Sequence, residues 1–193
     1  MFDIPCIIFA GGKSSRMGED KALLPFAGFN TLSEYQYSKL SKIFKNVYIS
    51  CKDKSKFDFV ANFIEDETDI DIFAPTVGFI TAFKKLKSEK IFVISVDTPF
   101  ISYEEIKMIY NNDTQSYDAT IAQTDNGIQP LCGIYHNSLI ASFTTMIQTN
   151  EHKLGFMLKN ANTKYIYFND AKPFLNLNHP HEYQEAIRII QNY

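Results

Sequence analysis

Glycines and cations are concentrated in one short segment near the start of the chain. The sequence Phe9-Ala10-Gly11-Gly12-Lys13-Ser14-Ser15-Arg16-Met17-Gly18-Glu19-Asp20-Lys21 holds three of the chain's eight glycines and three cations, Lys13, Arg16 and Lys21. Glycine lets the backbone approach a ligand closely, and inward-pointing amides bind anions. Amides and cations together suit a polyphosphate. A solvated surface loop is the alternative interpretation of the same composition.

This segment does not match either of two common phosphate-binding motifs. Gly12-Lys13-Ser14 imitates the end of a P-loop, but the upstream glycine of that motif would fall at Ile7. The G-x-G-x-x-G spacing of a dinucleotide-binding loop is also absent. The sequence therefore indicates a phosphate-binding loop of another kind.

A carboxylate and two amides elsewhere in the chain could complete such a site. Asp97-Thr98-Pro99 follows the apolar run 91–96, and Mg²⁺ prefers one or two carboxylates together with phosphate oxygens. Asp97 could equally cap a turn. Asn176 and Asn178 lie on the same side of an extended segment, and their amides can donate and accept. Capping of the last helix is the alternative for Asn178.

Several other residues are weaker candidates. Gln129-Pro130 could present an amide beside a strand, Ser50 ends a predicted strand, and Asp66 follows a possible short strand at 63–65. The four histidines lack metal-pair spacing, so we expect them on the surface.

Alternating strand and helix patterns predict the framework that positions these residues. We expect strands at 4–10, 47–51, 91–96, 118–123, 131–135 and 165–168, with a short one at 70–73. We expect helices at 31–44, 54–62, 77–87, from a capping box at Ser102 to 110, at 137–148, and from Pro180 onward. This order predicts an α/β fold with a parallel sheet made mixed by a hairpin-like pair around 125–127. Ligands of such sheets bind at the carboxyl ends of the strands.

Composition narrows the class of protein. The chain has 193 residues and a formal net charge of −3, which fits one globular domain and shows no basic excess for nucleic acid. No run reaches the roughly 20 apolar residues of a membrane span, and the first residues have no signal-peptide pattern. The three cysteines, Cys6, Cys51 and Cys132, are widely spaced, so we expect buried thiols in a cytoplasmic protein.

Taken together, the three segments resemble the MobA-type molybdenum cofactor guanylyltransferases, a family of the nucleotidyltransferase superfamily. Residues 9–21 match the signature L-A-G-G-x-S-x-R-M-G-x-D-K, Asp97-Thr98-Pro99 matches D-x-P, and Asn176 and Asn178 match N-x-N. The resemblance covers nearly the whole chain. It implies a single domain, 1–193, with a Rossmann-like three-layer α/β/α nucleotidyltransferase fold and a mixed, mostly parallel sheet. The N-terminal half would bind the nucleotide and the C-terminal half the acceptor.

The resemblance also implies a reaction and a set of site residues. GMP would pass from GTP to the phosphate of molybdopterin, releasing pyrophosphate, with Mg²⁺ held by Asp97. Family positions for GTP are Phe9, Ala10, Gly11, Gly12, Lys21, Ser50, Asp66 and Asp97; those for molybdopterin are Gln129, Pro130, Asn176 and Asn178. Molybdenum-insertion proteins and molybdoenzyme chaperones would be transient partners.

The phosphate chemistry agrees with that reaction. Displacement at the α-phosphorus spreads negative charge over oxygens, so catalysis is mainly positioning and electrostatic stabilisation. We expect Lys21 at the α-phosphate and Lys13 and Arg16 at the β- and γ-phosphates, with Asp97 holding the metal.

The chain departs from the family at two places. Ala74-Pro75-Thr76-Val77-Gly78 lacks the leading glycine of G-P-L-x-G, and Ser50 stands where an asparagine can occur. Two alternatives remain open. One is a cytidylyltransferase for molybdopterin or a sugar or polyol phosphate, and the other is a non-catalytic nucleotide-binding module.

Overall fold

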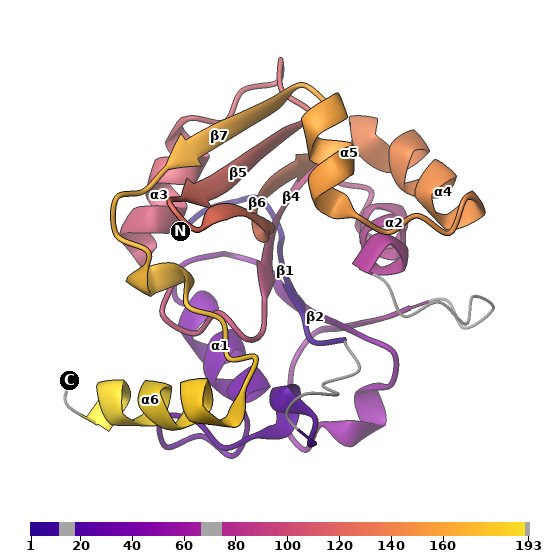
Figure 1. Ribbon diagram of the computed structural model, residues 1–193. Coiled ribbons are helices and arrows are strands. Elements are labelled where there is room, and N and C mark those ends of the chain that lie inside the picture. Colours follow the sequence, from indigo (N-terminus) through magenta and orange to yellow (C-terminus); the bar gives the residue numbers. More distant parts are fainter. Residues whose placement is uncertain (12–17, 67–74, 192–193) are drawn as a thin grey trace.

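A seven-stranded sheet forms the centre of the protein (Figure 1). The computed structural model describes residues 1–11, 18–66 and 75–191. The strands are β1 (Cys6–Phe9), β2 (Val47–Cys51), β3 (Phe63–Glu65), β4 (Lys90–Ser95), β5 (Ala119–Thr124), β6 (Gly127–His136) and β7 (Thr163–Tyr167), in the spatial order β3-β2-β1-β4-β6-β5-β7. Only β6, among these strands, runs antiparallel to its neighbours. The predicted mixed, mostly parallel sheet is therefore confirmed.

Helices cover both faces of this sheet, because the strands are apolar on both sides. Cys6 and Ile8 of β1 belong to one buried cluster, and Ile7 and Phe9 belong to the other. The first cluster includes residues of α1 (Leu32–Leu40), α3 (Tyr103–Asn111) and α6 (Pro180–Gln191); the second includes residues of α2 (Pro75–Leu86), α4 (Ile140–Gln148) and α5 (Leu154–Asn160). The two groups of helices lie on opposite sides of the sheet in Figure 1, which confirms the three-layer α/β/α architecture.

The order of the strands creates a crevice beside β1. From β1 the chain builds outward through β2 and β3, then returns to place β4 on the other side of β1. Strand order reverses at this point, and in open α/β sheets such a reversal leaves a crevice at the carboxyl ends of the two strands. The 9–11 segment leaves β1 there, and Asp97 follows β4.

Some predicted elements differ from the observed ones. The helix expected at 54–62 is a single 3₁₀ turn, Lys54–Lys56, because the alternating aromatics beyond it pack in extended chain: Phe57 stacks on Phe63 at 5.3 Å. α1 ends at Leu40, four residues before the predicted boundary. α5 was not predicted, since seven residues carry little periodic signal. The strand expected at 70–73 lies outside the described residues.

The cysteines and one histidine are buried. Cys6, Cys51 and Cys132 are free thiols in the core, as predicted. The expectation of surface histidines is wrong for His136, which is 8% exposed because its ring packs against a buried carboxylate. Across the described ranges, no helix is both long and apolar enough to cross a lipid bilayer.

A buried ionic network lies at the end of the sheet opposite the crevice, where β4 begins. The Asp113 carboxylate follows α3 and accepts hydrogen bonds from Lys90 Nζ at 2.6 Å, Thr120 Oγ1 at 2.7 Å and His136 Nε2 at 3.0 Å. Burial raises the pKa of Asp113, but these three hydrogen bonds outweigh it, so its pKa lies below its usual value. The network ties α3 to β4, β5 and β6.

Asp113→Asn removes this charge while keeping the shape of the side chain. Hydrogen bonds to charged groups contribute about 1.5–3 kcal/mol, so we expect a loss of about 2 kcal/mol in the free energy of unfolding at neutral pH. The folded pKa is depressed, so the wild-type advantage is complete above the unfolded value of about 3.9 and is lost as the pH falls through the folded value. Urea unfolding at neutral pH and near pH 3 measures this. An equal difference at both pH values would contradict it.

Candidate active site

Three of the predicted site residues meet around one ammonium group. Lys21 Nζ lies 2.5 Å from Asp97 Oδ2 and 3.0 Å from Asn178 Oδ1. The side chains of Lys21 and Asp97 are only 16% and 13% exposed. Asp97 and Asn178, which lie 76 and 157 positions after Lys21 in the sequence, therefore form a single polar centre with it at the crevice.

Local capping places Lys21 at this centre. Asp20 caps the 3₁₀ turn η1 (Lys21–Leu23), with its Oδ1 accepting from the amide of Ala22 at 3.0 Å. The other oxygen of Asp20 accepts from Lys56 Nζ at 2.6 Å. Asp20 thus fixes the start of the turn that carries Lys21.

The D-x-P and N-x-N segments interlock. Thr98 Oγ1 donates to Asn176 Oδ1 at 2.8 Å, and the amide of Leu177 donates to the carbonyl of Asp97 at 2.9 Å. Ser95 Oγ donates to Asp97 Oδ1 at 2.6 Å, which orients the carboxylate from within its own strand. The two asparagines therefore belong to the same polar centre as Asp97.

Asn178 does not cap the last helix with its side chain. Glu182 Oε2 accepts from the backbone amides of Asn178 and His179 at 2.7 and 2.8 Å. The amide side chain of Asn178 is left to face Lys21. The Asn178 side chain therefore contacts Lys21 and does not cap the last helix, which was the alternative raised by the sequence.

The predicted nucleotide-side residues lie at the ends of β1 and β2. The amide of Ala10 donates to the carbonyl of Ser50 at 2.9 Å, and Ser50 Oγ lies 3.5 Å from Asp66 Oδ1. Burial raises the pKa of Asp66. Phe9 and Gly11 flank this point in the chain, whereas Gly12, Lys13 and Arg16 lie outside the described residues.

The C-terminal candidates share a cavity with Asp97. This cavity has a volume of about 380 Å³ and is lined by Pro75, Ser95, Asp97, Thr98, Gln129, Pro130, Leu131, Cys132, His152, Leu154, Gly155, Asn176 and Asn178. All four residues predicted to face the acceptor are in its wall. The structure therefore brings the predicted acceptor-side residues together with Asp97, whereas Ser50 and Asp66 contact each other and are not among the residues that line this cavity.

His152 also lines this cavity, although the sequence predicted it on the surface. Its Nδ1 lies 3.0 Å from Thr76 Oγ1 at the start of α2, and its Nε2 lies 3.1 Å from Asn150 Oδ1. It stands between α4 and α5, in a segment with no motif. No spacing in the sequence links it to Asp97, so only the fold reveals it.

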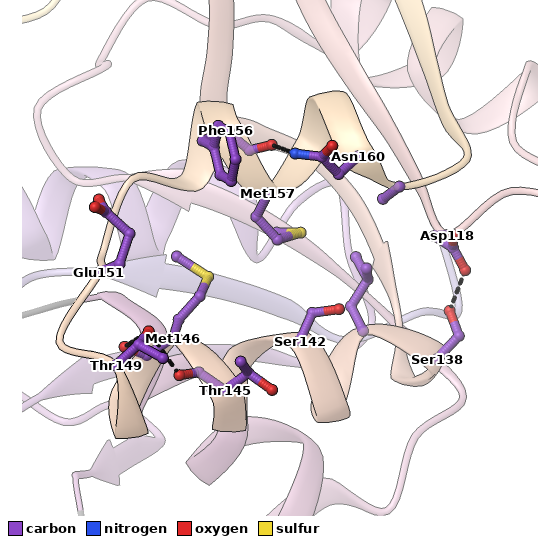
Figure 2. A pocket seen from close by; sticks show the side chains of 12 residues that line it. Asp118, Ser138, Ser142, Thr145, Met146, Thr149, Glu151, Phe156, Met157 and Asn160 are labelled. Carbon is purple, nitrogen blue, oxygen red and sulfur yellow. Dashed lines mark hydrogen bonds between the residues drawn. The ribbon is translucent and has the colours of Figure 1, made fainter.

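A second cavity, of about 500 Å³, lies between α4 and α5 (Figure 2). Hydroxyl-bearing residues such as Ser142 and Thr145 line it together with Met146, Phe156 and Met157. None of the predicted site residues is in its wall. The first cavity is therefore the one that carries the candidate chemistry.

The donor set at Asp97 fits a hard divalent cation. Asp97 is one carboxylate among oxygen donors from Ser95, Asn176 and Asn178, and Mg²⁺ takes one or two protein carboxylates with substrate phosphates supplying the rest. The described parts of the chain contain no group of three or more His, Cys, Asp or Glu side chains that could hold a metal alone. A metal at Asp97 would therefore need phosphate oxygens to complete its ligands.

The fold and this centre define a class of protein, one that binds a nucleotide at the switch point of an α/β sheet and transfers part of it. The chain belongs to the MobA-like NTP transferase domain family, whose pattern matches residues 6–164. It is therefore a nucleotidyltransferase, as its signature segments predicted.

Relatives of known name agree with this family. A molybdenum cofactor guanylyltransferase from Campylobacter jejuni subsp. doylei is 38% identical over 183 residues, covering 95% of each chain. One from Helicobacter pylori is 34% identical over 194 residues, covering 98% of this chain and 94% of that one. Among solved structures, a molybdopterin-guanine dinucleotide biosynthesis protein A from Archaeoglobus fulgidus has a TM-score of 0.83 at 21% identity, covering 98% of this chain and all of that one. That similarity confirms the fold.

Gly78→Ala tests how closely α2 approaches the nucleotide side. A Cβ at Gly78 would lie 2.4 Å from a ring carbon of Phe9 and 2.9 Å from Ser50 Oγ. Alanine in a helix normally gains about 1 kcal/mol over glycine, but overpacking costs about 1–3 kcal/mol. We expect a lower thermal midpoint for Gly78→Ala.

Gly155→Ala is the matched control. Its Cβ would lie 3.4 Å from Ile128 Cδ1, an ordinary contact, so the midpoint should stay the same or rise. Equal stability of Gly78→Ala and wild type would contradict the close packing.

Proposed function

We propose that this protein transfers GMP from GTP to the phosphate of molybdopterin, releasing pyrophosphate and forming the guanine dinucleotide cofactor. The observation that carries the proposal is the contact of Lys21 with both Asp97 and Asn178. Three signature segments thereby meet at one point, in a chain 38% identical to a molybdenum cofactor guanylyltransferase over nearly its whole length.

Charge explains the chemistry at this point. Attack of an acceptor phosphate oxygen on the α-phosphorus forms one P–O bond and breaks the bond to the leaving pyrophosphate. Negative charge grows on the non-bridging and leaving oxygens, and preorganised cations stabilise it. The second pKa of a phosphate monoester is about 6, so the attacking oxygen is ionised at neutral pH and needs no base.

Each proposed role follows from the match of the residue to the family's signature segments. Lys21 faces the α-phosphate, and Lys13 and Arg16 hold the outer phosphates. Phe9, Ala10, Gly11 and Gly12 belong to the phosphate-binding loop, and Ser50 and Asp66 lie toward guanine. The Asp66 carboxylate would accept hydrogen bonds from the N1–H and N2–H groups of guanine. Gln129, Pro130, Asn176 and Asn178 face the pterin across the cavity.

Mg²⁺ is the metal we propose, with Asp97 as its protein ligand. When bound, it would neutralise phosphate charge as a Lewis acid. Asn178 and Ser95 hold Lys21 and Asp97 in place around that position. We propose that the reaction takes place in the cytoplasm, where molybdenum-insertion proteins and molybdoenzyme chaperones would receive the product.

Lys21→Ala and Asp97→Asn test the assignment. Removing one preorganised transition-state donor commonly lowers kcat about 10²–10³-fold, and we expect at least that loss in pyrophosphate release from GTP with a molybdopterin acceptor. Lys164→Ala, an exposed lysine on β7, is the matched control and should keep the wild-type rate. Wild-type turnover by either site variant, at an unchanged fold, would overturn the assignment.

Thermal shifts with GTP, CTP, ATP and UTP, with and without Mg²⁺, test the nucleotide. A ligand that binds only the folded state stabilises it by RT ln(1 + [L]/Kd), so the largest rise identifies the preferred base. We expect GTP with Mg²⁺ to give that rise. A preference for CTP would support a cytidylyltransferase instead, and binding of GTP without turnover would support a non-catalytic module.

A further inference from the structure

Part of the buried face of α1 carries polar side chains beneath the active site. Ser33 and Gln36 are fully buried, and Lys39 is partly buried. Each donates to a backbone carbonyl outside the helix, and Ser33 Oγ reaches the carbonyl of Ala22, next to Lys21, at 2.8 Å. One helix face therefore contacts the turn that carries the Lys21 ammonium.

The same face also holds the turn that carries Asp97. Gln36 Nε2 lies 2.9 Å from the carbonyl of Thr98. Lys39 Nζ donates to the carbonyls of Pro99 and Ile101 at 2.6 and 3.0 Å. Pro99 has no amide hydrogen, so this turn has fewer donors of its own with which to satisfy its carbonyls.

Lys39 Nζ binds the carbonyls of Pro99 and Ile101 but no carboxylate among the described residues. It forms no ion pair within the parts of the chain that the structure describes, and its Nζ lies 5.4 Å from the centre of the Tyr35 ring. Burial lowers the pKa of Lys39 to about 7, against smaller opposite effects of Cys6, Cys132 and Glu105. The charged form of Lys39 is therefore less favoured here than in water, because a buried charge costs free energy unless it is paired.

A buried amino group without a carboxylate partner calls for a reason other than stability. Buried ionic groups are retained in some proteins because they specify one geometry rather than because they stabilise the fold. Here the geometry is that of the turn after β4, where Asp97 meets Lys21 at 2.5 Å. The amino group of lysine has at least two N–H donors whether charged or neutral, so it can bind two carbonyls of that turn at once, which an apolar side chain cannot.

We propose that Lys39, assisted by Gln36, is a positioning residue for nucleotidyl transfer: it holds the 97–101 turn so that the Asp97 carboxylate stays aligned with the ammonium of Lys21. The inference rests on the proposed function, because the alignment matters only if phosphate and metal bind there. The inference gives a role in the site to α1, a helix that lies outside the three signature segments.

Lys39→Met tests this role, because methionine has similar length but no donor. Small displacements in an active site can lower the rate about 10²-fold, so we expect kcat for pyrophosphate release to fall at least about tenfold. KM for GTP should change less than about twofold, since the phosphate loop is untouched. The additional rise in thermal midpoint that Mg²⁺ gives over GTP alone should shrink.

Two further variants keep the test decisive if Lys39→Met folds poorly. Lys39→Arg retains cationic donors and should recover most of the rate. Gln36→Met removes the contact with Thr98 and should lower kcat in the same direction. An arginine variant as slow as Lys39→Met would overturn the proposed role of the donors.

The controls separate positioning from stability. Lys42→Met changes an exposed lysine just beyond the end of α1 and should keep the wild-type kcat. Asp113→Asn lowers stability at the opposite end of the sheet and should also keep kcat. The inference is overturned if Lys39→Met stays within about twofold of the wild-type kcat, or loses no more kcat than Asp113→Asn at a matched loss of thermal midpoint.

The wild-type protein separates this inference from the proposed function. A wild type that releases pyrophosphate from GTP, beside a fully active Lys39→Met, would overturn only the positioning role. A wild type that neither binds GTP nor turns it over would overturn the proposed function, and the positioning role with it.

Discussion

The ion pair between Lys21 and Asp97 is the contact around which the site is organised. It joins the segment that follows β1 to the segment that follows β4, at the point where strand order reverses. Asn178 adds the C-terminal segment to the same ammonium. The ammonium group of Lys21 thus joins three regions that lie far apart in the sequence, and each region must keep its backbone in place for both contacts to form.

The surrounding structure keeps those backbones in place with polar contacts. Asp20 caps the turn of Lys21, Ser95 orients the Asp97 carboxylate, and Thr98 binds Asn176. Beneath them, polar side chains on the buried face of α1 reach both turns. Sites built this way limit the motion of charged groups, which is what electrostatic stabilisation of a phosphoryl transition state requires. The Asp113 network connects α3 to β4, β5 and β6 at the other end of the sheet, away from the polar centre.

The site also has an asymmetry between its two sides. On the side proposed for the nucleotide, α2 approaches Phe9 and Ser50 so closely at Gly78 that a side chain has no space. The side proposed for the acceptor holds a cavity of about 380 Å³, lined by residues that include Asp97, Gln129 and His152. This asymmetry agrees with the proposed division between the N-terminal and C-terminal halves.

Sequence alone predicted the alternation of strands and helices and the buried thiols, and it singled out Lys21, Asp97, Asn176 and Asn178 as candidates, because apolar runs, caps and signature spacings are local. Tertiary structure decided what depends on distant neighbours. It replaced the helix expected at 54–62 with packed aromatics, buried His136 against Asp113, brought His152 into the cavity wall, and directed Asn178 to Lys21 rather than to the helix end. It also placed Lys39 beneath Asp97. Apart from the stacking of Phe57 on Phe63, these contacts join residues tens of positions apart, and no periodicity along the chain encodes which of them meet.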